Sequence, residues 1–389
     1  MNRATLNEKV TKALSQRSLG ALLVCGPDNV QYLTGVCLPM LPVLAARQPL
    51  VVVWSQQQRA CVVPAALASS LSAAGWTGAV LPYPEGPDPA AEAARLVAGL
   101  VAGLPEGAPL GVDMERFTAG QLARLRAALP GRELVSADDL LRTLRQVKTE
   151  DEIELLERLA AMTDHGVAGA MHHVSTLGGR TEKFMCEDLR VHCLERGTDL
   201  APYHGLSLTA SGPHARVFWP VSPRFGIGQE KKMQPGEAVR MEMRASLDGY
   251  WADSARTLTM GQPDPDQAKG YAHLRELTAA ALSALRTGAR ACDVYAAVSA
   301  RAAELGADWI SGLGAGHGVG VTPYEAPYLT AWDETRLEAG MVLVIDLAVR
   351  LPGGEILRGK ETVTLAAEGP RLAETYQDWR QPYTAALTF

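Results

Sequence analysis

Acidic and histidine side chains recur at three places in the second half of the chain. Two acids stand eleven residues apart around an Asp248-Gly249 pair, which is typical of a two-residue hairpin turn. A hairpin there brings the two acids close in space. A histidine follows in Gly-Ala-Gly-His-Gly-Val-Gly, and two more acids lie in or beside later apolar runs. The five candidates are Glu242, Asp253, His317, Asp346 and Glu361.

Four carboxylates and an imidazole, if they converge, form a natural site for one or two divalent cations such as Mn²⁺, Co²⁺, Fe²⁺ or Zn²⁺. Asp346 lies inside the apolar run Val344–Ala348, where an unpaired charge is costly to bury, so something has to neutralise it. Spacing alone leaves other interpretations open. The hairpin can be a turn and nothing more, and Glu242 can face solvent or pair with Arg244 or Arg256.

The order of these residues and their local sequences resemble the pita-bread metallopeptidase family. The matching segments are residues 248–257 (Asp-Gly-Tyr-Trp-Ala-Asp-Ser-Ala-Arg-Thr), 316–320 (Gly-His-Gly-Val-Gly) and 361–363 (Glu-Thr-Val). That family includes methionine aminopeptidase, aminopeptidase P, prolidase and the metal-free creatinases. The N-terminal half is similar to the creatinase/prolidase N-terminal domain at residues 21–24, 27–35 and 141–153. Two domains in this order point to the Xaa-Pro peptidase and creatinase branch.

The resemblance implies a ligand set of Asp, Asp, His, Glu and Glu in that order. Glu242 then stands where the family has Asp, and Asp346 where it has Glu, whereas the other three residues match in type. One methylene moves a carboxylate by about 1.5 Å, whereas metal–oxygen distances tolerate about 0.2 Å. Backbone shifts, a changed metal spacing or the loss of one metal must therefore absorb the exchange. The implied cofactor is one or two divalent cations, with Mn, Co or Zn expected.

Two proton-handling histidines of the family are replaced, one by Trp219 and the other by Tyr324. The resemblance implies that metal-bound water attacks the scissile carbonyl and that Glu361 or a bridging neighbour accepts its proton. Tyr324 would stabilise the oxyanion, and Trp219 would pack against a proline ring. His204 and His214 lie nearby in the sequence and are the candidates to replace a missing imidazole.

Three arginines are candidates for binding the carboxylate of a peptide substrate through paired hydrogen bonds. Arg350 and Arg358 lie near the last two acids. Arg47 ends the apolar segment 38–47, which can act as a lid or a dimer contact. The alternative for each arginine is a solvated surface position.

The leading hypothesis is a metal-dependent peptidase that hydrolyses Xaa-Pro bonds of dipeptides or short peptides with an altered active site. The alternatives are a creatinase-like amidohydrolase acting on a small nitrogenous metabolite and a catalytically inactive homologue. Four buried acids without a cation would be strongly unfavourable near neutral pH, and this cost is the main reason to expect a metal.

The hydrophobic pattern divides the scaffold of these residues into two domains. In residues 1–147, short apolar runs such as Ala21–Cys25 alternate with amphipathic stretches such as Ala90–Gly103, which indicates an α/β domain. Thr149 and Glu152 form a capping box, which predicts a long helix just after the boundary. Residues 148–389 indicate a mixed sheet flanked by helices, an α+β layer structure, which the resemblance identifies as the pita-bread fold.

The composition excludes several classes of protein. The chain has 389 residues, of which 47% are hydrophobic and 21% charged, as in ordinary globular proteins. A net charge of −6 gives no field that would attract nucleic acid. No apolar run reaches the roughly 18 residues of a membrane span, and six cysteines without a C-x-x-C pair indicate reduced thiols. We therefore expect a cytoplasmic protein without a nucleic-acid or membrane partner. Together with the resemblance, we expect a homodimer that acts on a small peptide.

Overall fold

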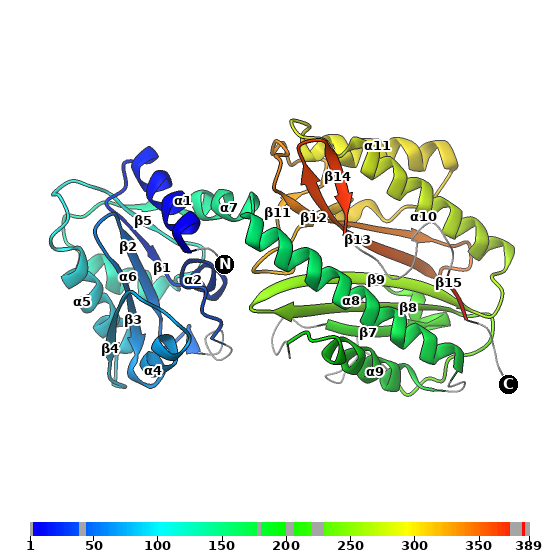
Figure 1. Ribbon diagram of the computed structural model, residues 1–389, viewed down its shortest axis with the longest axis horizontal. Coiled ribbons are helices and arrows are strands. Elements are labelled where there is room, and N and C mark those ends of the chain that lie inside the picture. The colour runs from blue at the N-terminus through cyan, green and yellow to red at the C-terminus, as the bar shows by residue number, and fades with distance from the viewer. Residues whose placement is uncertain are drawn as a thin grey trace. The chain divides into compact units, whose positions relative to one another are not determined.

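The computed structural model describes residues 3–38, 44–176, 180–199, 206–218, 229–373 and 383–385. The contacts divide the chain into two units, Met1–Arg145 and Gln146–Phe389 (Figure 1). The boundary predicted from the sequence, after residue 147, lies two residues further on. Each unit has its own sheets and its own buried side chains.

The first unit is built on a six-stranded sheet in the order β4-β3-β2-β1-β5-β6. The central strands β1 (Ala21–Val24) and β2 (Val51–Ser55) are short apolar runs in which every side chain is buried, as expected for strands covered on both faces. The other elements are α1 (Arg3–Gln16), α2 (Pro27–Thr34), β3 (Arg59–Pro64), α4 (Ala65–Ala73), β4 (Ala79–Tyr83), α5 (Pro89–Val101), β5 (Leu110–Val112), α6 (Ala119–Ala128), β6 (Leu134–Ser136) and α7 (Asp138–Gln146).

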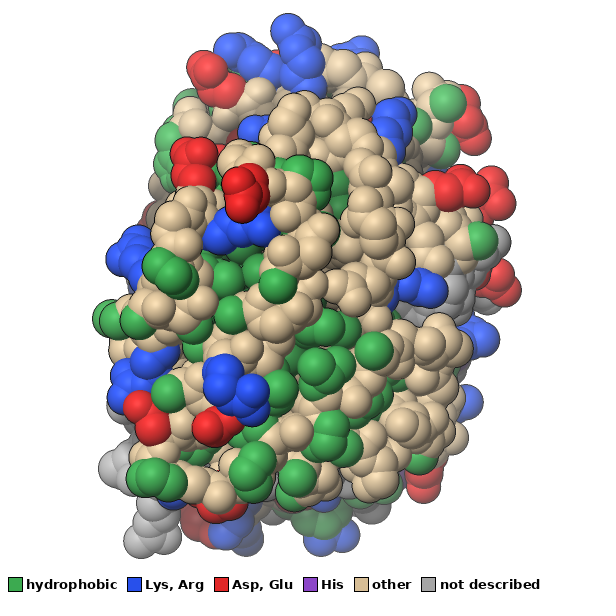
Figure 2. Space-filling view, turned by 90° about the vertical axis from the view of Figure 1, so that its left-hand side faces the viewer, with side chains coloured by type: hydrophobic (Ala, Val, Ile, Leu, Met, Phe, Trp, Pro, Cys, Tyr) green, Lys and Arg blue, Asp and Glu red, His purple; other side chains and the backbone are tan. Residues whose placement is uncertain are grey.

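The strand β4 forms one edge of this sheet, and four of its five side chains are partly or fully exposed. Pro82 lies within it and has no N–H to offer to a further strand, so it helps protect the edge. Figure 2 shows the side of this unit that lies at the left of Figure 1. There hydrophobic side chains gather across the middle of the face, and charged ones lie around them.

The second unit contains two sheets, one in the order β11-β10-β12-β13-β14 and one in the order β15-β9-β8-β7. Helices α10 and α11 lie beside the first sheet, and α8 and α9 lie beside the second (Figure 1). The elements are α8 (Glu150–Thr176), α9 (Glu182–Glu195), β7 (Leu206–Ser211), η1 (Gly212–Arg216), β8 (Ala238–Leu247), β9 (Tyr250–Met260), α10 (Pro265–Ala284), α11 (Ala291–Leu305), η2 (Ser311–Leu313), β10 (Gly316–Gly318), β11 (Glu325–Tyr328), β12 (Val342–Arg350), β13 (Ile356–Ala366), β14 (Gly369–Leu372) and β15 (Tyr383–Ala385).

Two local predictions are confirmed in this unit. Asp248 and Gly249, with φ of 49° and 77°, form the two-residue turn between β8 and β9. The Glu152 carboxylate accepts a hydrogen bond from the Thr149 backbone N–H at 2.8 Å, and the Thr149 hydroxyl accepts one from the Glu152 N–H at 3.4 Å. This capping box starts α8, the long helix that lies beside β8 and β9.

The two sheets of the second unit meet along β9 and β13. The Thr257 hydroxyl of β9 donates to the Arg358 carbonyl at 3.0 Å and accepts from the Arg358 N–H at 2.9 Å. The site described below lies at this seam.

None of the helices in the described part of the chain has the length and apolar character of a membrane span.

Candidate active site

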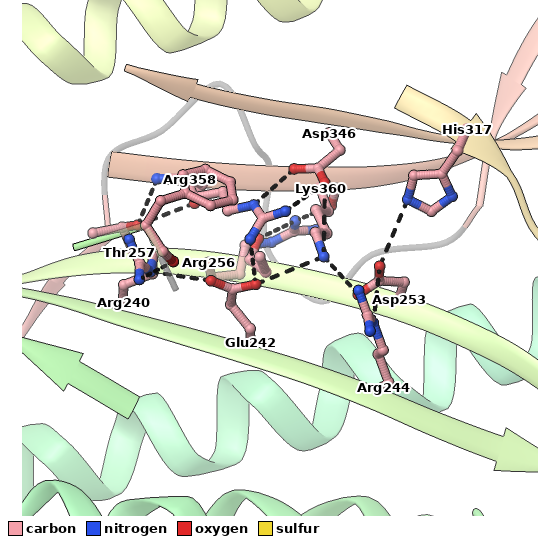
Figure 3. A network of polar contacts seen from close by, with 12 residues as sticks. Arg240, Glu242, Arg244, Asp253, Arg256, Thr257, His317, Asp346, Arg358 and Lys360 are labelled. Carbon is pink, nitrogen blue, oxygen red and sulfur yellow. Dashed lines mark hydrogen bonds and ion pairs between the residues drawn. The ribbon is translucent and has the colours of Figure 1, made fainter. Parts of the chain in front are cut away.

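The register of β12 and β13 decides which charged side chains face one another. Asp346 of β12 lies directly opposite Lys360 of β13. Because side chains alternate along a strand, Arg358 shares the face of Lys360, and Glu361 points to the opposite face. Lys360, rather than the predicted metal ligand Glu361, therefore lies on the same face as Asp346. Figure 3 shows Lys360 and Arg358 between Asp346 on one sheet and Glu242 and Asp253 on the other.

The Lys360 ammonium is fully buried among three carboxylates. Its Nζ donates to Asp253 Oδ1 at 2.7 Å, and it lies 3.7 Å from Glu242 Oε2 and 3.8 Å from Asp346 Oδ2. These three acids are the ones that the sequence predicts as carboxylate ligands on this face. A fixed ammonium at their centre supplies the positive charge that a metal ion would supply.

The Arg358 guanidinium joins the two sheets. It binds Asp346 with two hydrogen bonds, Nε to Oδ1 at 2.8 Å and Nη2 to Oδ2 at 2.6 Å, and its Nη1 donates to Glu242 Oε2 at 2.6 Å. The ring of Phe218 covers the guanidinium at 4.3 Å. Arg358 was predicted to bind a substrate carboxylate, but all three of these bonds go to carboxylates of the chain itself. Its side chain is 1% exposed.

Glu361 lies apart from the other four predicted ligands. Its carboxylate pairs with Arg256 at 3.1 and 3.2 Å, and the same guanidinium lies 2.8 Å from Asp164 of α8. In the structure β13 begins at Ile356, so Glu361 lies in mid-strand and its facing follows from the strand pleat.

The buried charges of this region balance without an added ion. Burial alone would raise the pKa values of Asp253 and Asp346, but Lys360 and Arg244 lower that of Asp253, and Arg358 and Lys360 lower that of Asp346. Arg240 lies 3.0 Å from Glu242 Oε1. In the described part of the chain, five carboxylates face five cations: Asp164, Glu242, Asp253, Asp346 and Glu361 against Arg240, Arg244, Arg256, Arg358 and Lys360.

His317 completes the cluster from β10. Burial lowers its pKa despite the nearby Asp253, so its imidazole is neutral near pH 7. Its Nδ1 donates to the Gly318 carbonyl at 2.9 Å, which leaves Nε2 as the atom with a lone pair. Nε2 lies 3.6 Å from Asp253 Oδ2, and neither atom has a hydrogen-bond partner among the residues that the structure describes, although Asp253 Oδ2 also lies 3.4 Å from Arg244 Nε. This pair can therefore hold one additional proton.

Strand packing accounts for two of the glycines around His317. A Cβ on Gly316 would lie 2.1 Å from the Val344 carbonyl oxygen of β12. A Cβ on Gly318 would lie 2.4 Å from the Ala326 carbonyl oxygen of β11. Both positions have to be glycine because β10 is held between two closely spaced strands.

The donor set does not fit a pair of metal ions. Among the described residues, one group of three ligand atoms lies within 4.8 Å of one another, and that group is His173, Asp188 and His192 on α8 and α9. The five predicted ligands form no such group. Lys360 and Arg358 already use the carboxylate oxygens that would coordinate the ions.

Tyr324 lies beside this cluster, as predicted for a residue of the site. Its ring centroid is 4.2 Å from that of His317, and 43% of the residue is exposed. The rings of Tyr328 and Trp332 continue outward from Tyr324 at successive centroid distances of 5.3 and 5.9 Å. These three rings form an aromatic row that leads from the surface to His317.

The other predicted site residues that the structure describes lie elsewhere. His214 of η1 pairs with the buried Glu182 at 2.8 Å. Arg350 lies 3.6 Å from Asp308 at the exposed end of β12, and Arg47, in the first unit, pairs with Glu85 in solvent. None of these contacts involves the cluster around Lys360. His204, Trp219 and half of the apolar segment 38–47, residues 39–43, lie outside the described residues.

The sequence interpretation missed two members of the cluster, Lys360 and Arg240. Their signal was the alternation of charge within apolar strands, since Arg240 and Glu242, like Arg358 and Lys360, stand two residues apart. A separate groove of about 760 Å³ runs along α8 and includes Glu157, His165 and Arg371. It contains none of the predicted site residues. Beside Asp253 and Lys360 the cavity measures about 10 Å³, room for one water molecule at most.

Comparisons with known proteins agree with this architecture. Residues 154–372 match the model of metallopeptidase family M24, and residues 7–147 match the creatinase/prolidase N-terminal domain. Peptidases of family M24 depend on a dinuclear metal centre. The crystal structure of dipeptidase PepE from Mycobacterium ulcerans superposes with a TM-score of 0.81 at 26% identity, covering 98% of each chain. Prolidase from Thermococcus sibiricus superposes with a TM-score of 0.82 at 21% identity, covering 99% of each chain, which shows the shared fold.

Curated relatives carry peptidase names. The chain is 30% identical over 236 residues to the probable dipeptidase PepE of Mycobacterium tuberculosis, which is 60% of each protein's length. It is 26% identical over 250 residues to the Xaa-Pro dipeptidase of Pyrococcus furiosus, or 64% of this chain and 68% of that protein. The family match covers more than half of the chain, and the order of the two domains agrees with it. The chain thus belongs to metallopeptidase family M24 and has the creatinase/prolidase type of N-terminal domain.

Proposed function

We propose that this chain hydrolyses short peptides or other small amides, as the names of its relatives suggest, and that Lys360 and Arg358 take the place of metal ions in its active site. The observation that carries this proposal is the Lys360 ammonium, 2.7 Å from Asp253 and surrounded by the predicted ligands. The expected Mn²⁺-dependent Xaa-Pro peptidase remains the alternative that the experiment must exclude. The predicted homodimer and cytoplasmic location stay predictions.

In this proposal, His317 is the group that activates water. Its neutral Nε2 carries a free lone pair and lies next to Asp253, which would stabilise the imidazolium once it forms. The imidazole takes a proton from the attacking water and returns it to the nitrogen of the broken C–N bond. Tyr324 is exposed on one side and contacts His317 on the other, so a substrate that reaches His317 has to pass beside the Tyr324 ring.

The aromatic row gives this site its substrate preference. Tyr324, Tyr328 and Trp332 offer adjacent ring faces, of which that of Trp332 is 70% exposed. Apolar rings of this kind pack well against the flat ring of proline or another small apolar residue. We therefore propose a substrate with an apolar group next to the scissile amide.

A second candidate is binding of the same small amides without hydrolysis. The observation that favours it is the tight packing of the cluster, where His317 is 1% exposed and the adjacent cavity holds one water at most. Substrate turnover separates the two candidates, because both predict binding at the aromatic row.

The experiment measures hydrolysis of Ala-Pro, Leu-Pro and Ala-Ala by the full chain, with excess Mn²⁺ and with EDTA. We expect the rates in Mn²⁺ and in EDTA to agree within about twofold, and His317→Gln to lower the rate by at least about 100-fold. His172→Gln, at an exposed position, is the matched control and should keep the rate. Hydrolysis that needs Mn²⁺ and stops in EDTA would overturn the metal-independent mechanism. Binding of the peptides without any hydrolysis would select the second candidate.

A further inference from the structure

Two helices of the second unit bring together three side chains that can bind a metal ion and that are not part of the Lys360 cluster. His173 lies near the end of α8, whereas Asp188 and His192 stand four residues apart on α9. We propose that His173, Asp188 and His192 form a binding site for one Zn²⁺ ion, with the fourth position open to water. This proposal does not depend on the proposed hydrolase activity.

The ligand atoms already have the spacing of a tetrahedral site. His173 Nδ1 lies 3.1 Å from both carboxylate oxygens of Asp188 and 3.2 Å from His192 Nε2. His192 Nε2 lies 3.6 Å from Asp188 Oδ2. Bonds of about 2.0–2.1 Å to Zn²⁺ in a tetrahedral arrangement separate the ligand atoms by about 3.3–3.4 Å. The observed separations lie on both sides of that value, so small side-chain adjustments would suffice.

The close approach of the two imidazoles is itself informative. Two ring nitrogens 3.2 Å apart must share a proton if no ion is present, because two lone pairs repel each other. The rings are held nearly edge to face, with centroids 4.6 Å apart, so both nitrogens point at Asp188. A cation between them would satisfy both lone pairs and the carboxylate charge at once.

Neighbouring residues hold His192 in this orientation. Its Nδ1 lies 3.5 Å from Glu195, which is the position of an outer carboxylate that fixes a metal-binding imidazole. Gly169 of α8 makes room for the ring, because a Cβ at this position would lie 3.0 Å from His192 Nδ1. Both contacts leave Nε2 directed toward Asp188.

The chemistry of the ligands selects the ion. Two imidazoles and one carboxylate suit Zn²⁺, which accepts four-coordinate sites of mixed nitrogen and oxygen ligands. The side chain of His173 is 36% exposed, whereas those of Asp188 and His192 are 13% and 16% exposed, so an ion can enter from the side of His173. Bound Zn²⁺ would connect the end of α8 to the middle of α9, which packs on β7.

The test titrates the metal-free full chain with Zn²⁺ against a chromophoric chelator and records the absorption spectrum with Co²⁺. We expect one Zn²⁺ per chain and the intense visible bands of tetrahedral Co²⁺. His173→Gln and His192→Gln should each weaken zinc binding by more than about 100-fold, beyond the 10–100-fold typical of an outer partner. His172→Gln, next to His173 but exposed, is the control and should bind as the parent does.

Two further variants make the outcome unambiguous. Gly169→Ala should weaken zinc binding without removing a ligand, because it displaces the His192 ring. Asp253→Asn should leave zinc binding unchanged. Zinc binding that persists in His192→Gln, or no binding by the parent chain at micromolar Zn²⁺, would overturn the proposal. Loss of binding in Asp253→Asn instead would place the ion in the Lys360 cluster and overturn the metal-independent mechanism as well.

Discussion

Each unit of this protein buries acidic side chains, but different groups stabilise them: amide donors at Asp113 in the first unit, and fixed cations at Asp253 and Asp346 in the second. In the first unit, Asp113 accepts hydrogen bonds from the Gly26 N–H and the Asn29 amide at 3.0 and 3.2 Å. Burial raises its pKa to about 6. In the second unit, Asp253 is buried as deeply and the side chain of Asp346 is 9% exposed, yet cations lower the pKa values of both acids: Lys360 and Arg244 for Asp253, and Arg358 and Lys360 for Asp346.

The difference shows that a fixed cation at bonding distance, rather than burial, decides in which direction the pKa values of these acids shift. Amide donors reduce the cost of burying Asp113 but do not remove it. Within the first unit, Asp28 shows the same effect, since Arg145 and Arg116 outweigh its burial and lower its pKa. Under our proposal, Lys360 and Arg358 supply the positive charge that metal ions supply in the peptidases of the family.

The largest expected effect comes from removing Lys360. Lys360→Met leaves Asp253 and Glu242 without their shared cation, and breaking a buried ion pair in this way costs about 3–5 kcal/mol. Urea unfolding followed by circular dichroism measures the loss. Added Mn²⁺ should then stabilise the variant but not the parent chain, because an ion can enter only where the ammonium has been removed. In this comparison both chains also carry His192→Gln, so that metal binding at α9 does not contribute.

Lys183→Met is the matched control, because Lys183 pairs with Glu230 in solvent. It should leave the unfolding midpoint unchanged. A Lys360→Met variant as stable as this control would show that the ammonium does not neutralise the cluster.

A smaller effect, of opposite sign, is expected at Asp113. Its pKa rises from about 3.9 in the unfolded chain to about 6 in the folded one, so the folded state prefers the protonated acid. Stability from this group is greatest below pH 4 and is lost as the pH rises to 6. Asp113→Asn keeps one oxygen to accept both hydrogen bonds and should raise the free energy of unfolding at pH 7.5 by about 1–2 kcal/mol.

Unfolding of the parent and of Asp113→Asn between pH 4 and 7.5 measures this slope, which the variant should lack. Asp253 and Asp346 add a slope of opposite sign only below about pH 5, where these acids take up protons in the unfolded chain, and this contribution is common to both chains. Equal slopes in the two chains would contradict the raised pKa of Asp113.

The smallest expected effect, the loss of a helix N-cap, provides a reference for the other changes in the free energy of unfolding. Each unit has a capping box with the same chemistry, Thr118 with Gln121 at α6 and Thr149 with Glu152 at α8. Thr118→Ala and Thr149→Ala should each lower the free energy of unfolding by about 1 kcal/mol. A much larger loss for Thr149→Ala would mean that Glu152, which also accepts from the Tyr250 hydroxyl at 2.9 Å, couples α8 to the strands of the site.

Local signals in the sequence were sufficient for much of the fold. The Asp248-Gly249 turn and the Thr149 capping box depend on a few adjacent residues, and the structure contains both. The resemblance gave the family and the two kinds of domain, which the comparisons confirm.

The arrangement of the site depends on which face of its strand or helix each side chain occupies, and local signals in the sequence do not determine this. Glu361 and Lys360 are adjacent, and only the start of β13 at Ile356 and its pairing with β12 decide which of them faces Asp346. The same holds for the adjacent residues His172 and His173, of which only His173 faces α9. His173 contacts His192 because α9 folds back along α8, a long-range arrangement absent from the local pattern.

The position of Lys360 also affects how the protein depends on its surroundings. A cation that is part of the polypeptide is in place as soon as the strands pair, whatever the supply of manganese or zinc in the cell, and no chelator can remove it. The same attachment imposes a limit, because an ammonium cannot change its coordination number or release a bound oxygen as an ion does. Under our proposal the active site gains independence from metal supply and gives up the chemistry that only an exchangeable ion provides.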